Sequence, residues 1–178
     1  MKVEMLRIEN GDGKGSRNGR IIVSRKRPEL VKRLFELEVP EIQNGTVVIR
    51  SVAREAGSRT KIAVQSMDPQ VDPLGACVGP HFMRVSNVVK ELNNEKVDII
   101  PWDSDEATFV ARSLSPAKVS MVLIDSENKK ARVIVDNDQQ SLAIGKTGQN
   151  ARLAAKLTGW KIDIKTHEQI ENQKFYED

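Results

Sequence analysis

Hydrophobic residues along the chain alternate between helical spacing and strand spacing in a fixed order. After Pro28, apolar side chains recur three and four residues apart, at Leu30, Val31, Leu34, Phe35 and Leu37. This spacing predicts an amphipathic helix, because positions three and four apart share one face. Proline is tolerated in the first helical turn and ends a helix that reaches it. We therefore expect the first helix to lie between Pro28 and Pro40.

The segments after Pro40 predict a compact mixed unit. Strands are expected at 46–52 and 60–64 around a turn at Gly57-Ser58, and the remaining elements are a helix at 72–78, a turn at Gly79, a helix at 84–92 and a strand at 96–100. Glycine and proline mark the breaks between these periodic segments. The predicted order is helix, strand, strand, helix, glycine turn, helix, strand.

The same order repeats after residue 103. Asp103 and Glu106 resemble a capping box at the start of a helix that Pro116 ends. The elements expected next are strands at 119–125 and 131–136, helices at 139–144 and 149–158, and a strand at 160–166. A fixed order repeated once indicates two copies of one small unit. We predict an α+β fold with units at 28–102 and 103–166, followed by a polar tail at 167–178 that frays.

Two further segments bear on this organisation. Residues 1–27 contain strand-like runs at 3–8 and 20–24 around a flexible turn at 11–15. Two strands alone are marginal in water, so this piece packs onto the neighbouring unit or belongs to something larger. Trp102 lies at the short joint between the units. It is either a plug in the interface between the units or a core residue of the first unit.

A Gly-x-x-Gly turn at Gly145–Gly148 carries the main functional prediction. Gly79 occupies the matching position of the first unit, 66 residues earlier. A lone turn of this kind is typical of two helices joined by glycine caps. Here the repeat and the basic helix after the turn favour a KH-type module, which clamps single-stranded nucleic acid.

The chemistry of this turn suits a nucleic-acid backbone. Glycine permits close approach, and the next helix directs its N-terminal amides at phosphate. Lys146 adds charge, while Gln149 shares a helix face with Arg152 and Lys156. Ile144 and Val135 are candidates for an apolar floor beneath the bases. The RNA-binding residues expected in the second unit are Ile144, Gly145, Lys146, Thr147, Gly148, Gln149, Asn150, Arg152 and Lys156.

The first unit departs from this pattern, because Phe82 stands where the second glycine belongs. In one interpretation a base stacks on Phe82 or His81. In the other, which we favour here, the clamp is partly lost and Phe82 packs inward. The candidates in this unit are Gly79, Pro80, His81 and Arg84. The nearby hairpin cations Arg50, Arg54, Arg59 and Lys61 either contact phosphate or, as we favour, lie on a solvated hairpin.

Composition adds exclusions. The chain has 39% hydrophobic and 30% charged residues, a net charge of +3 and a pI near 9.0, which mildly favours a polyanionic partner. It has no apolar run that would span a bilayer, and its start lacks the pattern of a signal peptide. A single cysteine, Cys77, excludes a disulfide framework and a Cys-rich zinc site and favours a reducing cytoplasm. Gln140 stands where a P-loop needs glycine, and His81 and His167 lack partners at ligand spacing. We expect no enzyme activity, no metal, no cofactor and no membrane contact.

Several longer stretches resemble the NusA family of bacterial transcription factors. They are residues 32–42 (KRLFELEVPEI), 52–57 (VAREAG), 72–79 (DPLGACVG), 95–99 (EKVDI) and 141–164 (SLAIGKTGQNARLAAKLTGWKIDI). The resemblance runs from about Val23 to Thr166. It implies two bacterial-type (type II) KH domains, each a three-stranded mixed sheet backed by three helices, and it identifies residues 1–27 as the last strands of an OB-fold barrel.

The same resemblance implies a function. We expect a cytoplasmic, monomeric RNA-binding factor that acts with RNA polymerase and other transcription factors in elongation, termination and antitermination. The rest of the barrel and the domain through which the family engages polymerase are not in the chain, so we expect a part or a shortened member of the family. The alternative is a rigid KH scaffold that works mainly through protein contacts.

Overall fold

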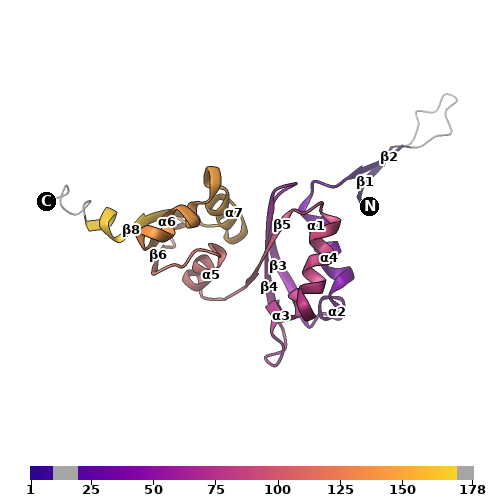
Figure 1. Ribbon diagram of the computed structural model, residues 1–178, viewed down its shortest axis with the longest axis horizontal. Coiled ribbons are helices and arrows are strands. Elements are labelled where there is room, and N and C mark those ends of the chain that lie inside the picture. Colours follow the sequence, from indigo (N-terminus) through magenta and orange to yellow (C-terminus); the bar gives the residue numbers. More distant parts are fainter. Residues whose placement is uncertain (10–19, 172–178) are drawn as a thin grey trace.

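The computed structural model describes residues 1–9 and 20–171, arranged as an elongated molecule with a β-hairpin at one end and two α+β units (Figure 1). The turn expected at 11–15 and most of the polar tail lie outside the described residues. Residues 167–171 form a helical turn, so the fraying predicted for the polar tail does not begin there. None of the described helices is long and apolar enough to cross a bilayer.

The first unit has the element order that the hydrophobic pattern predicts. Its elements are α1 (Pro28–Glu38), α2 (Pro40–Gln43), β3 (Val47–Glu55), β4 (Arg59–Ser66), α3 (Pro73–Val78), the 3₁₀ turn η1 (Pro80–Phe82), α4 (Met83–Glu91) and β5 (Lys96–Pro101). The sheet order is β3-β4-β5, with β3 antiparallel and β5 parallel to β4. Asp72 caps α3 by accepting hydrogen bonds from the backbone amides of Leu74 and Gly75.

The second unit repeats this topology without a counterpart of α2. Its elements are α5 (Glu106–Ser113), β6 (Met121–Asp125), β7 (Lys130–Val135), α6 (Asn137–Ile144), the 3₁₀ turn η2 (Lys146–Gly148), α7 (Gln149–Thr158) and β8 (Lys161–Thr166). The sheet order is β6-β7-β8, again mixed. The fold is therefore α+β, with two tandem units that each have a three-stranded mixed sheet and three principal helices.

The start of α5 corrects one sequence prediction. Asp105, not Asp103, is the N-cap, and its carboxylate accepts hydrogen bonds from the backbone amide and hydroxyl of Thr108. Asp103 instead accepts a hydrogen bond from the Asp105 amide at 2.9 Å. The expected capping box is wrong because the chain turns once more before the helix begins.

The N-terminal hairpin consists of β1 (Glu4–Glu9) and β2 (Arg20–Ser24), which pair antiparallel. Glu91 at the end of α4 anchors it to the first unit. The Glu91 carboxylate accepts hydrogen bonds from the Lys2 amide at 2.6 Å and from Arg25 at 3.0 Å. The hairpin is thus joined to the first unit at its base, through residues next to its strands, while β1 and β2 project away from that unit (Figure 1). Its assignment to an OB-fold barrel stays a prediction.

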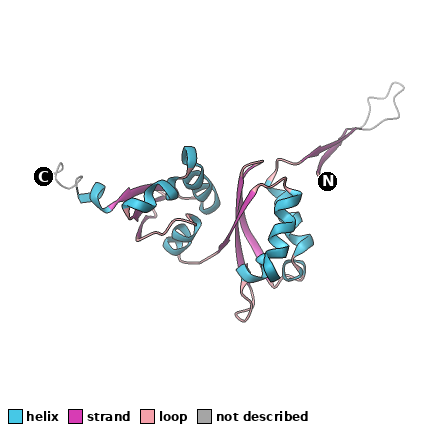
Figure 2. Cartoon of the chain, viewed as in Figure 1, coloured by secondary structure: helices cyan, strands magenta, loops and turns pink. Residues whose placement is uncertain are grey.

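A hydrophobic cluster joins the two units in addition to the core inside each. The sheet of the first unit has α1 and α4 on one face and the helices of the second unit on the other (Figures 1 and 2). Phe109, Leu153 and Leu157 from α5 and α7 pack against Ala53, Ala63 and Ile100 of that sheet. Small alanines on the sheet let the larger helical side chains approach closely.

Trp102 belongs to this shared cluster. Its ring packs at a tilt against Phe109, with 6.4 Å between ring centroids, and the Arg50 guanidinium lies 4.8 Å above it. The interface interpretation of Trp102 is therefore confirmed. The two units therefore pack against each other through a shared hydrophobic interface.

Candidate nucleic-acid interface

The Gly145–Gly148 turn has a backbone that requires glycine at its start. Gly145 ends α6 with φ of 77° and ψ of 170°, and Gly148 precedes α7 in the left-handed region with φ of 76°. A Cβ on Gly145 would lie 2.8 Å from both the backbone nitrogen and the Cβ of Asn150. Space as well as φ therefore excludes a side chain at Gly145.

The centre of this turn is available to a ligand. Lys146 and Thr147 are exposed, as is the Ile144 side chain just before them. The turn leads directly into α7, whose first amides form the positive end of the helix dipole. Val135 is fully buried in the core of the second unit, so its expected place in an apolar floor is wrong.

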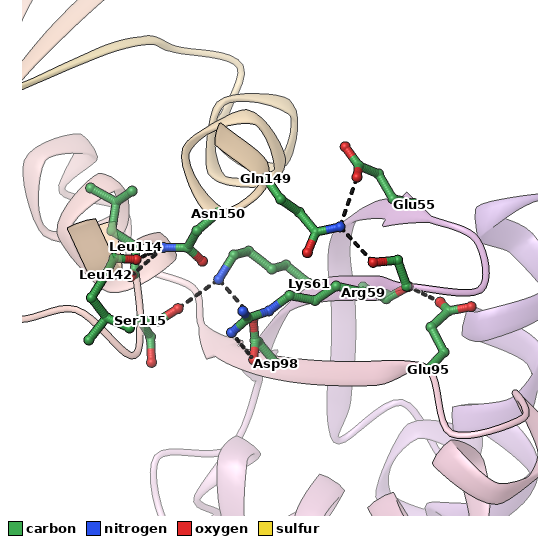
Figure 3. Close-up of polar contacts among 12 residues, drawn as sticks. Glu55, Arg59, Lys61, Glu95, Asp98, Leu114, Ser115, Leu142, Gln149 and Asn150 are labelled. Atoms are coloured by element: carbon green, nitrogen blue, oxygen red, sulfur yellow. Dashed lines mark hydrogen bonds and ion pairs between the residues drawn. The ribbon is translucent and has the colours of Figure 1, made fainter. Parts of the chain in front are cut away.

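Asn150 is buried and works inside the protein. Its side-chain amide donates hydrogen bonds to the carbonyl oxygens of Leu114 at 2.9 Å and Ala143 at 3.0 Å. In Figure 3 the side chain points toward Leu114 and Leu142, away from the first unit. The expected hydrogen bond from Asn150 to RNA is therefore wrong for the side chain, which instead ties the glycine turn to the end of α5.

Gln149 and Arg152 lie on one face of α7, as predicted, but that face meets the first unit. Gln149 donates to Glu55 at 2.9 Å and to the Ser58 hydroxyl at 2.7 Å (Figure 3). Arg152 donates to Glu55 at 2.6 Å. These hydrogen bonds, Arg152 first, lower the pKa of the Glu55 carboxyl from 4.5 to about 2. Lys156, also on this helix, is exposed. The sequence correctly predicted that Gln149 and Arg152 share a helix face, but it did not predict their contact with Glu55.

The hairpin cations of the first unit are structural. Arg54 pairs with Glu95 at 2.9 Å, and both side chains are at most 4% exposed. Lys61 is completely buried, donates to Asp98 at 2.8 Å and reaches the Ser115 carbonyl of the second unit at 2.7 Å. Arg59 pairs with Asp98 at 2.7 Å. Burial lowers the pKa of the Lys61 ammonium. The solvated-hairpin interpretation is therefore wrong for Arg54 and Lys61.

The first loop keeps the backbone of the second despite its different sequence. Gly79, His81 and Phe82 have φ of 73°, 51° and 59°, against 77°, 53° and 76° for Gly145, Thr147 and Gly148. Phe82 adopts the left-handed conformation of the missing glycine, and its side chain is 68% exposed. The expectation that Phe82 packs inward is wrong.

Arg84 braces the first loop as Asn150 braces the second. Each residue lies five positions after the first glycine of its turn. Arg84 donates to the Ala76 carbonyl at 2.6 Å and to Glu41 at 2.8 Å. Its guanidinium is thus engaged at the end of α3, while Pro80 and His81 stay exposed.

Two kinds of reactive group can be checked in the described part of the chain: metal-binding clusters and the cysteine thiol. No group of three or more His, Cys, Asp and Glu residues there is arranged to hold a metal ion. Cys77 is buried, and burial raises the pKa of its thiol to about 12, which keeps it protonated and unreactive.

Comparisons with known proteins agree with this geometry. Residues 25–102 match the model of the NusA-like first KH domain, and residues 106–172 match that of the NusA-like second KH domain. The chain is 57% identical over 166 residues to the transcription termination/antitermination protein NusA of Bacillus subtilis. The matched region covers 93% of this chain and 44% of the relative. The protein of that name from Thermus thermophilus is 49% identical over 168 residues, covering 94% of this chain and 42% of the relative.

A solved structure is similar in fold alone. The crystal structure of APE1850 superposes with a TM-score of 0.55 at 20% sequence identity, covering 78% of this chain and 97% of that one. The chain spans less than half the length of the Bacillus and Thermus relatives.

Proposed function

The chain belongs to the NusA-like family of tandem KH domain proteins, and from that premise we propose that it binds single-stranded RNA for a factor of transcription termination and antitermination. The observation that carries the proposal is the exposed Gly145–Gly148 turn leading into the N-terminus of α7. Such a turn presents backbone amides and no side-chain bulk to an extended strand.

Within this site the residues divide by role. Ile144, Lys146 and Thr147 contact RNA, with Gly145 and Gly148 shaping the turn that they lie on. Gln149 and Arg152 face the first unit and contact RNA only with the atoms that their protein partners leave. Lys156 is exposed on the same helix and contacts RNA with its ammonium group. Asn150 and Arg84 hold the two loops in shape.

Family membership supports the wider role that we propose. RNA polymerase and other transcription factors are the proposed protein partners, and the proposed compartment is the cytoplasm. By the same family resemblance, the proposed role is non-enzymatic, and the proposed oligomeric state is a monomer.

A matched pair of charge variants tests RNA binding. Lys146→Asp with Thr147→Asp places negative charge in the turn. Lys161→Asp with Ser126→Asp makes the same charge change outside it, at the start of β8 and in the turn between β6 and β7. The ten residues of α7, about 15 Å long, separate the glycine turn from the segment that leads into β8. All four positions are exposed. The loop variant should lose affinity for single-stranded RNA by roughly ten-fold or more, with the control nearly unchanged. Equal losses in the two variants would reject the turn as the site.

The shared hydrophobic cluster favours a second candidate function. A rigid pair of units joined by Phe109, Leu153 and Leu157 suits a scaffold for protein partners. Under that function the unaltered chain and both variants would bind RNA polymerase. The loop variant and the control variant would then bind RNA equally weakly. Pull-down of polymerase by both variants, measured beside RNA binding, separates the two functions.

A further inference from the structure

Phe82 has a strained backbone and an exposed side chain, so it adds little to the stability of the fold. Its φ of 59° and ψ of 19° lie in the left-handed region, close to the 76° and 13° of Gly148. Bulky L-residues avoid this region because the Cβ crowds the backbone. Burial offsets little of this strain, because 68% of the residue is exposed.

The neighbours of Phe82 make the loop tip an apolar surface. Met83 is 60% exposed, and Pro80 and His81 are exposed as well. Below this tip the loop is held firmly, since Arg84 ties it to Ala76 and Glu41. The structure thus presents a planar ring on a rigid, strained turn, and strain kept in this way is typical of functional positions.

We propose that Phe82 stacks on an unpaired RNA base, so that the first loop contributes a base contact where the second contributes backbone contacts. The inference rests on the proposed function. RNA is favoured over a protein ligand because the first loop has the same backbone as the RNA-binding turn of the second unit, at the start of the equivalent helix α4. Stacking on a phenylalanine ring accepts any base, because every base has a π-face.

Three variants of the full chain separate stacking from other roles of this side chain. Phe82→Leu keeps an apolar side chain and the backbone strain but removes the aromatic face. Phe82→Trp keeps the face. Phe82→Gly removes the side chain and relieves the strain, because glycine accepts positive φ. Stacking predicts that Leu and Gly weaken single-stranded RNA binding by about 5- to 100-fold, while Trp retains it.

Thermal unfolding adds a readout that moves in the opposite direction. Phe82→Gly should raise the unfolding temperature while it lowers RNA affinity, because the strain and the stacking face are removed together. A core role for the ring would instead lower the unfolding temperature, and that result would overturn the proposal.

RNA with a single abasic nucleotide, moved along the strand, identifies the stacked base. At one position the abasic nucleotide should weaken RNA binding by the unaltered chain and have no effect on binding by Phe82→Leu, because that variant has already lost the contact.

Two results would overturn the proposal: wild-type RNA affinity in both Phe82→Leu and Phe82→Gly, or tighter RNA binding by Phe82→Gly. If the unaltered chain binds no RNA, the proposed function itself fails. If only Lys146→Asp with Thr147→Asp matters, the function stands and Phe82 is not part of it. RNA binding unchanged but polymerase binding lost in Phe82→Leu would assign the ring to a protein contact.

Discussion

Arg152 of α7 and Glu55 at the end of β3 lie 97 positions apart in the sequence and 2.6 Å apart in the structure. Their contact closes the joint between the two units at its polar edge, beside the Phe109, Leu153 and Leu157 cluster. The arginine that the sequence assigns to RNA is therefore also a tether for the first unit. RNA that reaches α7 meets a helix face whose charge is already partly neutralised.

This ion pair should show measurable coupling in unfolding experiments. The Arg152 and Glu55 side chains are 45% and 26% exposed, so solvent screens the pair and its coupling should be small. A double-mutant cycle with Glu55→Gln and Arg152→Gln, followed by urea unfolding, measures it. The exposed pair Arg33–Glu36 within α1 is the control and should show weaker coupling. Additive losses at Glu55 and Arg152 would mean that the tether contributes nothing.

Acid should destabilise the protein in part through Glu55. Its folded pKa of about 2 lies below the usual 4.5, so the carboxylate stabilises the folded state fully above pH 4.5 and loses this effect as the pH falls toward 2. Glu55→Gln should therefore give a flatter curve of unfolding free energy between pH 5 and pH 2. Denaturant titrations across that range provide the measurement, with Glu36→Gln as an exposed control. Parallel curves for Glu55→Gln and the unaltered chain would contradict the prediction.

Asn150 should matter for stability and, through loop shape, for binding. Asn150→Ala leaves the Leu114 and Ala143 carbonyls without their side-chain donor, which costs about 1–3 kcal/mol. Asn150→Asp should be worse, because a carboxylate would face carbonyl oxygens. Urea unfolding checks the order of the two variants. An aspartate variant as stable as the alanine variant would show that the amide donor is not what holds the turn.

The two glycines of the second turn should respond differently to alanine. A Cβ at Gly145 meets Asn150 at 2.8 Å, whereas a Cβ at Gly148 has Arg152 Nη1 as its nearest neighbour at 3.8 Å. Gly145→Ala should therefore lower the unfolding temperature far more than Gly148→Ala, which carries only the left-handed backbone strain of about 1–2 kcal/mol. Phe82 shows that the fold accepts a side chain at the position of Gly148. RNA binding by Gly148→Ala should still fall, because the added Cβ would lie where the RNA backbone is proposed to approach the turn.

Salt dependence should report on Lys146 directly. Each phosphate neutralised on a single strand contributes about 0.7 to the slope of log affinity against log salt. Lys146→Gln should therefore reduce the slope by about 0.7. Lys161→Gln, at the start of β8, should leave it unchanged. Titrations of single-stranded RNA at several salt concentrations provide the slopes. An unchanged slope for Lys146→Gln would place the phosphate contact elsewhere.

The sequence by itself determined the repeated order of elements and the position of the glycine turn. Both depend on neighbours in the chain: apolar spacing defines each helix face, Pro28 and Pro40 bound α1, and Gly145 is needed by the backbone of its own turn. The NusA-like resemblance rests on the same contiguous stretches, which is why the fold class could be predicted without the structure.

The tertiary structure decided which of the predicted side chains are available to RNA. Asn150, Arg152 and Lys61 have the residue types of a binding site, yet each is engaged by a group from another segment: Leu114, Glu55 and Ser115. Phe82 has the residue type of a core position and lies in solvent instead, because the backbone of the turn fixes its direction. Burial and pairing are set by segments that meet only after folding, and no local pattern records where those segments meet.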